Sequence, residues 1–266
     1  MTERATTSHR VLVTGSTGAI GQPLSRYLVS RGHTVRGFAR RPTPGLDDSV
    51  VGDLSDRDAV RRAVEGVDTV VHLGAYPNDA DFLDVLLGPN VIGLYHVCEA
   101  AAELGVKRLV LASTVQVITG HPMSDRAVTV ADGPAPTNHY ALTKAWAELA
   151  GDMYARVHNV SVISVRIGWL PRNTDEARRL AASPHGRNVF FSHDDSDRFF
   201  ARCVESENPA PGTSVVLQAT SRPVGPARMD IEPAREIIGY VPQDTWPEGL
   251  PFPVESGAVF GQDERD

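Results

Sequence analysis

The chain has 266 residues, of which 41% are hydrophobic and 22% charged, a composition typical of globular proteins that bury a sizeable core. Its formal net charge is -7 and its arginines are scattered among 33 acidic residues, so no basic block indicates a nucleic-acid partner. The two cysteines, Cys98 and Cys203, have no metal-ligand spacing around them, which argues against a disulfide framework and a zinc site.

The sequence gives no targeting signal. Its first ten residues, MTERATTSHR, lack the apolar core of a signal peptide. No later run approaches the roughly 18 apolar residues of a membrane span. We therefore expect a cytoplasmic protein without a membrane partner, and we expect disorder at residues 1–8 and in a tail at 257–266.

Short apolar runs alternate with helical periodicity from residue 10 onward. Strands are predicted at 10–15, 33–40, just before Gly52, 67–75, 107–114 and 160–168, and helices at 20–32, 56–66, 90–104 and 140–158. This alternation predicts an α/β fold built on a doubly wound parallel (Rossmann) sheet with six or seven strands by residue 168.

The texture of the sequence changes after residue 168. Residues 170–266 hold 11 of the 19 prolines, in short helical and turn-rich segments. We therefore predict a Rossmann core at 1–168 and a small substrate-binding C-terminal cap at 169–256 that is interleaved with the core.

The first strand is followed at once by TGSTGAIG, with Gly15, Gly18 and Gly21 in a GxxGxxG spacing. Glycines at such a junction allow a tight turn, close approach of a pyrophosphate to the backbone, and close packing of the next helix. A merely tight turn is the alternative. The position at the first strand-to-helix junction favours dinucleotide binding, and no GxxxxGK[ST] pattern indicates a P-loop nucleotidase.

The end of the second strand reads GFARRP, where a carboxylate would bind the ribose of NAD. Arg40 and Arg41 stand there instead, and a guanidinium matches a 2′-phosphate well. We therefore predict NADP, with NAD as the alternative; the arginines could also be solvated loop charges. Asp53, after the third strand, is interpreted as an adenine ligand or as a helix N-cap.

Tyr140 and Lys144 lie four residues apart in a predicted helix, so they share one face. Lys144 is one of only two lysines, whereas 24 basic residues are arginines, and its compact ammonium can lower the pKa of a neighbouring tyrosine. Ser113 and Thr114 end a buried strand, and either hydroxyl could orient a substrate oxygen. Strand-end hydroxyls can equally be caps.

Histidines near these motifs form no HxxxH or HExxH pair, so we predict no metal site. The segment SHDD at 192–195 is interpreted as a helix start in which Ser192 caps and Asp195 completes a capping box. No GxSxG motif indicates a serine hydrolase.

Several strings together resemble the extended short-chain dehydrogenase/reductase family over about residues 10–205. These are TGSTGAIG, GDL, VVHLGA, NVIGLYHVCEAA, LVLAST, YALTK and VRIG. Within that family, NVIGLY, VRIG and FSHDD are similar to the uronate dehydrogenases, which oxidise hexuronic acids. The resemblance implies a homodimer joined through the two long helices at 90–105 and 140–158.

The resemblance also implies roles for individual residues. It implies that Thr114, Tyr140 and Lys144 form the catalytic triad. It also implies that Arg178 binds a substrate carboxylate, or Arg179 if the correspondence is shifted by one residue. Asn90 supports the site through its helix. The cofactor residues it implies, with those argued above, are Gly15, Thr17, Gly18, Ile20, Arg40, Arg41, Asp53, Leu54, Leu73, Gly74, Ala75, Asn90, Tyr140, Lys144 and Ile167.

The substrate side departs from the uronate dehydrogenases. Pro77, Val115, Gln116 and Trp169 stand where those enzymes have small or polar contacts, and SPHGRN is inserted before FFSHDD. A tryptophan places a large apolar wall where a polyol partner would be. We predict an NAD(P)-dependent oxidoreductase acting on a hydroxyl or carbonyl of a small polar molecule, such as a uronic (sugar) acid or a related compound. The alternative is a nucleotide-sugar epimerase or dehydratase with tightly held cofactor.

Overall fold

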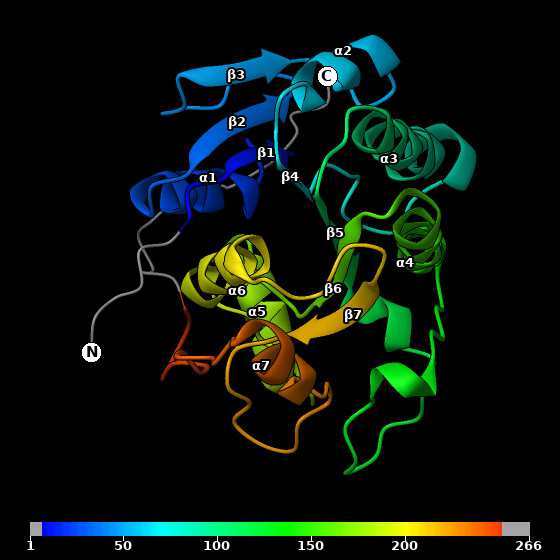
Figure 1. The fold of residues 1–266 in the computed structure, drawn as a ribbon. Coiled ribbons are helices and arrows are strands. Elements are labelled where there is room, and N and C mark those ends of the chain that lie inside the picture. Colours follow the sequence, from blue (N-terminus) through cyan, green and yellow to red (C-terminus); the bar gives the residue numbers. More distant parts are fainter. Residues whose placement is uncertain (1–6, 252–266) are drawn as a thin grey trace.

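The structure is a computed structural model that describes residues 7–251. Its centre is a seven-stranded parallel sheet in the order β3-β2-β1-β4-β5-β6-β7 (Figure 1). The strands are β1 (Arg10–Thr14), β2 (Thr34–Ala39), β3 (Asp48–Val51), β4 (Thr69–His72), β5 (Arg108–Thr114), β6 (Ser161–Ile167) and β7 (Ser214–Ala219). The predicted doubly wound Rossmann sheet is confirmed.

Helices cover both faces of the sheet, as Figure 1 shows. One face carries α1 (Gly21–Ser30), α6 (His193–Glu205) and α7 (Glu232–Ile238), and the other carries α2 (Arg57–Val64), α3 (Gly93–Glu103) and α4 (His139–His158). The remaining helix, α5 (Thr174–Ala182), lies at the carboxyl edge and packs through Ala177 and Leu180 against Phe190 and Trp246.

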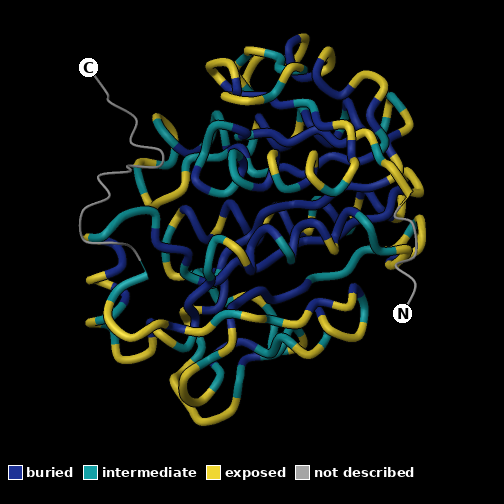
Figure 2. The backbone as a smooth tube through the Cα atoms, turned by 90° about the vertical axis from the view of Figure 1, so that its left-hand side faces the viewer, coloured by how far each residue is buried: buried dark blue, intermediate teal, exposed yellow. Residues whose placement is uncertain are grey.

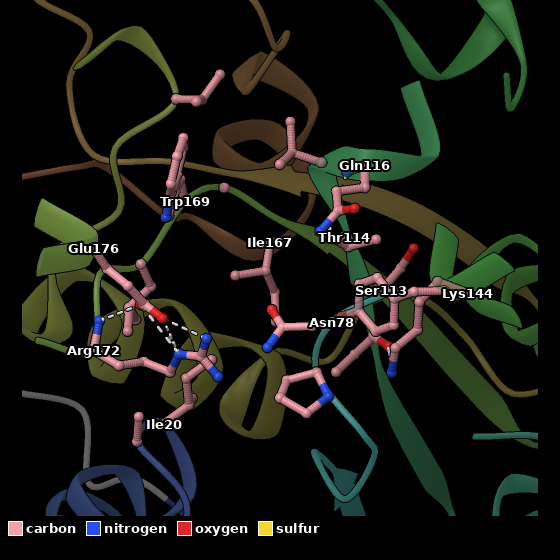
Figure 3. A pocket seen from close by; sticks show the side chains of 18 of the residues that line it. Ile20, Asn78, Ser113, Thr114, Gln116, Lys144, Ile167, Trp169, Arg172 and Glu176 are labelled. Carbon is pink, nitrogen blue, oxygen red and sulfur yellow. Dashed lines mark hydrogen bonds and ion pairs between the residues drawn. The ribbon is translucent and has the colours of Figure 1, made fainter. Parts of the chain in front are cut away.

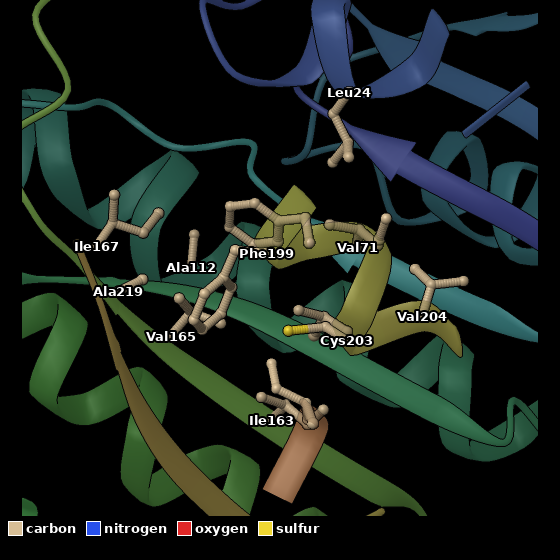
Figure 4. Close-up of a cluster of buried hydrophobic side chains, with 14 of the residues drawn as sticks. Leu24, Val71, Ala112, Ile163, Val165, Ile167, Phe199, Cys203, Val204 and Ala219 are labelled. Atoms are coloured by element: carbon tan, nitrogen blue, oxygen red, sulfur yellow. The ribbon is translucent and has the colours of Figure 1, made fainter. Parts of the chain in front are cut away.

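Two apolar clusters fill the spaces between the sheet and its helices. Strand side chains alternate between them: Val11 and Val13 join the α1 and α6 side, whereas Leu12 joins the α2 and α3 side. Figure 4 shows the first cluster, in which Phe199 and Cys203 of α6 meet Val165 of β6. The strands run as buried segments through the middle of the molecule (Figure 2), as expected for a parallel sheet covered on both faces.

Two elements differ from the sequence prediction. The helix expected at 90–104 begins at Phe82, because a π-helical segment, η1 (Phe82–Ile92), leads directly into α3. Gly88 and Pro89 would interrupt an ordinary α-helix there, but the wider π-helical turn continues the helix, with the Gly93 amide donating to the Gly88 carbonyl. The second difference is β7, a strand that the prediction lacked.

The chain returns to the sheet after residue 168, because β7 pairs with β6 from Val162↔Ser214 to Ile167↔Ala219. Helix α6 also packs on the sheet. The residues outside this framework, chiefly α5 and the segments near 190, 222 and 245, cover the carboxyl edge. The boundary at 168 stays a prediction, and the tail predicted at 257–266 lies outside the described residues.

One helix bears on the expectation that no segment spans a membrane. The continuous helix Phe82–Glu103 is long and apolar enough to cross a membrane by length and composition, with a mean hydropathy of 1.2 in its most apolar window. That window is 44% buried inside the fold, where Leu94, Val97 and Cys98 contribute to the core. The core helix of a folded protein meets the same criteria of length and composition.

Candidate active site

The glycine-rich loop between β1 and α1 is shaped by close backbone approaches. Gly15 has φ +67°, and a Cβ there would lie 2.8 Å from the Gly74 amide nitrogen. A Cβ on Gly21 would lie 2.3 Å from the Gly15 carbonyl oxygen. Any larger residue at these positions would push the loop away from β4 or from α1.

The N-terminus of α1 suits a phosphate group. Ile20 occupies the N-cap and provides no side-chain acceptor, and the first turn holds no acid. The helices α2, α4, α5 and α6 begin instead with Asp56, Asn138, Asn173 and Ser192 as side-chain caps. The α1 amides that no side chain caps, at the positive end of the helix dipole, therefore fit the pyrophosphate of a dinucleotide.

A cavity of about 780 Å³ runs along the carboxyl ends of β1, β4, β5 and β6 (Figure 3). In a doubly wound sheet this edge, at the switch between β1 and β4, is where ligands bind. Of the predicted site residues, those that line it are Gly15, Gly18, Ile20, Leu73, Ala75, Pro77, Thr114, Val115, Gln116, Tyr140, Lys144, Ile167 and Trp169.

Tyr140 and Lys144 face this cavity from the first turns of α4. The helix begins there because the Asn138 carboxamide accepts from the Ala141 amide at 2.7 Å. Asp79, from the loop after β4, adds a second acceptor for the amides of His139 and Tyr140, at 3.1 and 3.3 Å. The start of α4 is thereby tied to the β4 loop.

Lys144 is buried and donates through Nζ to the carbonyl of Ala112 at 3.0 Å. Its ammonium lies 5.8 Å from the centroid of the Tyr140 ring. Burial lowers the pKa of Lys144 to about 8. The lysine is therefore confined between the helix and β5.

The pKa of Tyr140 moves opposite to the sequence expectation. Burial raises it to about 12, while a hydrogen bond with Thr114 and the charge of Arg172 act in the lowering direction. Without a bound cofactor, the protein alone therefore keeps this phenol protonated at neutral pH.

The two strand-end hydroxyls have different partners. Ser113 donates to the Glu148 carboxylate at 2.6 Å. Thr114 accepts from the Gln116 amide at 3.3 Å and is bonded to Tyr140. Of the two alternatives, Thr114 is the hydroxyl that contacts Tyr140.

A buried ion pair behind the site was missed by the sequence reasoning. Glu148, one turn after Lys144, receives two hydrogen bonds from Arg166 of β6 at 2.9 and 2.8 Å. Both side chains are almost fully buried. With the bond from Ser113, Glu148 therefore joins α4 to the ends of both β5 and β6.

Asn90 lies behind the cavity and not in its lining. Its side chain accepts from the Tyr76 amide at 2.7 Å and donates to the Tyr76 carbonyl and to Thr143 at 3.1 and 3.2 Å. It thus holds the β4 loop against α4, which agrees with a supporting position. The cofactor contact predicted for Asn90 has no counterpart in the cavity lining.

Another group of predicted cofactor residues lies outside the lining. Arg40 and Arg41 are exposed after β2, and Thr17 lies within the glycine loop. Gly74 packs against Leu54, since a Cβ on Gly74 would lie 2.9 Å from Leu54 Cδ1. The set comprises Thr17, Arg40, Arg41, Asp53, Leu54 and Gly74.

Asp53 is not a helix N-cap, which corrects one of its two interpretations. Its carboxylate accepts from the backbone and hydroxyl of Ser55 at 2.8 and 2.7 Å, and Asp56 caps α2 instead. The backbone and then side-chain bonds from Ser55, with a smaller effect of the Arg40 charge, lower the pKa of Asp53. The aspartate therefore stays ionised beside Arg40.

Arg178 does not reach the cavity, which corrects the predicted substrate contact. It lies on the outer face of α5, with its side chain 61% exposed, paired with Asp175 at 2.9 Å. Arg179, the alternative, lines the cavity. The helical spacing in the sequence already indicates this outward position. Ala177 and Leu180 mark the inner face of α5, and a residue one position after Ala177 points away from that face.

Further lining residues were not predicted. Arg172 and Glu176 come from the start of the α5 region, Asn78 follows Pro77, and Met123 and Arg228 come from loops. Their positions in the lining depend on how distant loops meet over the sheet.

The histidines and the SHDD segment have structural partners. His72 is buried, with Nδ1 2.8 Å from the Thr14 hydroxyl, and burial followed by the charge of Lys144 lowers its pKa to about 3. Ser192 caps α6, as predicted, by accepting from the Asp195 amide at 2.9 Å. The second bond of the predicted capping box, from the Ser192 amide to the Asp195 carboxylate, is wrong. The Asp195 carboxylate accepts instead from the amides of Gln243 and Asp244. Among residues 7–251, no cluster of three potential metal ligands occurs.

Comparison with known proteins agrees with this architecture. Residues 11–170 match the NAD dependent epimerase/dehydratase family. The chain is 33% identical to L-arabinose 1-dehydrogenase (NAD(P)(+)) of Haloferax volcanii, over 88% of this chain and 96% of that one. It is 33% identical to the uronate dehydrogenase of Pseudomonas syringae pv. tomato, over 78% and 73%.

The fold is also similar to that of a solved uronate dehydrogenase. The Agrobacterium tumefaciens enzyme, crystallised as a mutant complexed with NAD, aligns with a TM-score of 0.75 at 26% identity, covering 90% of this chain and 86% of that one. Fold and site together define an NAD(P)-dependent dehydrogenase/reductase of the extended short-chain type. The chain belongs to the NAD dependent epimerase/dehydratase family.

Proposed function

We propose that this protein transfers a hydride between NAD(P) and a hydroxyl or carbonyl carbon of a sugar or sugar acid, using Thr114, Tyr140 and Lys144. The observation that carries this proposal is that these three side chains line one cavity, which the glycine loop also lines. The relatives named for L-arabinose and uronate oxidation support a sugar-type substrate.

Each residue of the triad has a distinct task. Tyr140 takes the hydroxyl proton in oxidation and returns it in reduction, and Thr114, already bonded to that phenol, orients the substrate oxygen. Lys144 places a positive charge beside the phenol. Because burial raises the pKa of Tyr140 to about 12, one cation does not suffice to ionise it. When bound, the oxidised cofactor would supply the hydride acceptor and a second positive charge near the phenol.

The cofactor proposed is NADP, with NAD as the alternative. Arg40 and Arg41 extend from the end of β2, where the ribose of the adenine half would lie. The charge of Arg40 lowers the pKa of Asp53, so the negative charge of Asp53 partly offsets that of Arg40. Of the two arginines, Arg41 is therefore the one whose positive charge is less offset by Asp53. A 2′-phosphate would meet two guanidinium groups here.

The assembly proposed is a homodimer joined through α4 and the η1–α3 helix. Exposed apolar residues recur along the outer face of α4 at turn spacing, and η1–α3 adds three more. They are Leu142, Trp146, Leu149, Met153 and Val157 on α4, with Leu83, Ile92 and Tyr95 beside them. An apolar stripe of this kind marks an interface, and a second copy would bury it as a four-helix contact. Light scattering tests this, with a strict monomer as the contrary result.

The function is tested with a panel of neutral aldoses, hexuronic acids and their lactones, assayed with NADP and with NAD. Formation of reduced cofactor with at least one sugar is expected. Cofactor that stays bound through purification, together with rearranged sugar and no net reduced cofactor, would favour an epimerase or dehydratase and contradict the proposal.

A further inference from the structure

Arg172 is fixed at the cavity wall by a single acidic partner. Its Nε donates to the Glu176 carboxylate at 2.9 Å, Nη2 donates to the same oxygen, and its backbone amide donates to the other oxygen at 2.8 Å. Glu176 is itself held, because its amide donates to Asn173 at 2.9 Å. The dashed lines in Figure 3 mark the Arg172 bonds.

This pair is close to neutral as a unit. Burial opposes ionisation of Glu176, yet the bonds from Arg172 hold the pKa of that carboxyl below its usual value. The carboxylate side chain is only 8% exposed. A second carboxylate brought to Arg172 would therefore meet a fixed negative charge on the same guanidinium.

Arg172 keeps its Nη1 amino group for a ligand. Its Nη1 has no hydrogen-bond partner among residues 7–251, and Figure 3 shows the guanidinium extending toward the middle of the cavity, on the side of Asn78. The charge of Arg172 also acts on the Tyr140 hydroxyl across the cavity. The free amino group thus faces the space between α5 and the catalytic wall.

The other arginines near the cavity are engaged or distant. Arg178 points outward to Asp175. Arg228 donates to the carbonyls of Ile118, His121 and Pro122. Arg179 is 70% exposed and lies 3.9 Å from the Glu176 carboxylate. Arg228 is buried and has no acidic partner among the described residues, but three main-chain carbonyls occupy its two Nη groups, and Arg179 lies largely in solvent.

Two further lining residues, Trp169 and Gln116, are uncharged. Trp169 is held by its backbone, which donates to Val189 at 2.6 Å and accepts from Phe191 at 3.0 Å. The side-chain oxygen Oε1 of Gln116 accepts from the Asn138 side chain at 2.8 Å, which leaves the side-chain NH₂ group of Gln116 for a ligand. A flat apolar wall and neutral donors match an uncharged polyhydroxy compound.

We propose that Arg172, held by Glu176, is a specificity-determining residue that binds a neutral hydroxyl or carbonyl oxygen, and that the substrate is an uncharged sugar and not its carboxylate counterpart. This inference rests on the proposed function. In this proposal Glu176 neutralises the charge of Arg172 and repels a substrate carboxylate.

The test compares D-galactose with D-galacturonate, which differ only at carbon 6. For the wild-type protein, kcat/KM should be at least about tenfold higher for the neutral sugar. Glu176→Gln keeps the shape of the side chain and removes its charge, so the ratio should move at least about tenfold toward the uronate. Arg172→Met should raise KM for galactose more than it lowers kcat.

Arg178→Met is the matched control, because it removes a nearby arginine, on α5, that does not line the cavity; the ratio should stay unchanged. Thermal unfolding of each variant confirms that it is folded, and Arg179→Met supplies a second variant that leaves the Arg172 pair intact. Three results would overturn the inference and leave the oxidoreductase proposal standing. They are a wild-type preference for the uronate, an unchanged kcat/KM ratio in Glu176→Gln, and a shift of that ratio toward the uronate that occurs only in Arg179→Met. No reduced cofactor with either sugar or any member of the wider panel would overturn both.

Discussion

The two walls of the cavity are built differently. On the catalytic wall, buried side chains are each held by more than one element: α4 is tied to the β4 loop by Asp79 and to β5 and β6 by Glu148. On the opposite wall, Trp169, Arg172 and Arg179 stand on loops and on the short helix α5. This contrast indicates that the chemistry is fixed by the fold and that substrate choice is set by segments laid over it.

After Tyr140 itself, the largest effect is expected on the catalytic wall, at Lys144. Lys144→Arg keeps the charge but places a larger planar group in a fully enclosed position, so kcat/KM should fall about 100-fold or more. Steady-state kinetics with the best sugar measures this. Lys107→Arg is the control, because the only other lysine has an 80% exposed side chain and should tolerate the change. Equal activity of the two variants would contradict a catalytic role for Lys144.

The next effect is on stability, at the pair behind the same wall. Arg166→Met leaves the buried Glu148 carboxylate without its partner and should lower the free energy of unfolding by about 3 kcal/mol or more. Denaturant titration measures the loss. Arg156→Met breaks an exposed pair with Asp152 and should cost less than about 1 kcal/mol. Similar losses in both variants would remove the distinction between buried and exposed pairs.

A pH-dependent effect is expected at His72, also behind the catalytic wall. Its folded pKa is about 3, because burial and then the charge of Lys144 disfavour the imidazolium, and its unfolded pKa is near 6.5. Between these values the unfolded chain binds a proton that the folded chain does not, so stability falls as the pH falls through this window. From pH 7 to pH 4 this one group should remove about 3 kcal/mol.

His72→Asn keeps a group that can bond Thr14 and removes the titration. Its free energy of unfolding should therefore vary less between pH 7 and pH 4 than that of the wild-type protein, in denaturant titrations at each pH. His158→Asn is the control, because the His158 ring is exposed. This variant should show the same pH dependence of stability as the wild-type protein. If His72→Asn shows the wild-type pH dependence, the buried neutral imidazole is not the source of acid sensitivity.

The smallest effect is expected at the exposed adenine end. Arg41→Ser should raise KM for NADP by about tenfold and leave KM for NAD nearly unchanged, because it removes one guanidinium from the proposed phosphate site. Arg57→Ser, which alters an exposed arginine paired with Glu103, is the control. Equal changes for the two cofactors would argue against a 2′-phosphate contact.

Prediction from the sequence succeeded where the signal is local. The glycine spacing, the apolar strands and the four-residue interval between Tyr140 and Lys144 each follow from short-range geometry, and the structure brings these elements to one sheet edge. The start of the long helix at Phe82 was missed because Gly88 and Pro89 look like a break and the π-helical turn is not evident locally.

Contacts between distant segments could not be predicted in this way. The pair of Glu148 and Arg166 depends on how α4 lies against β6, and β7 joins the sheet only because the chain returns after α6. Arg178 was chosen by alignment with relatives, although the spacing of Ala177 and Leu180 turns it outward. Arg172 was not recognised because its role depends on Glu176 and on the shape of the whole cavity.

The most direct test of the account is Tyr140→Phe, assayed with saturating cofactor and the best sugar from the panel. The change removes the one hydroxyl that exchanges the proton and leaves the ring packing, so kcat/KM should fall about 100-fold to 10,000-fold while the Kd for the cofactor stays close to that of the wild-type protein. Tyr95→Phe, at a half-exposed tyrosine of α3, should keep full activity. Wild-type kcat/KM in Tyr140→Phe would contradict the central claim.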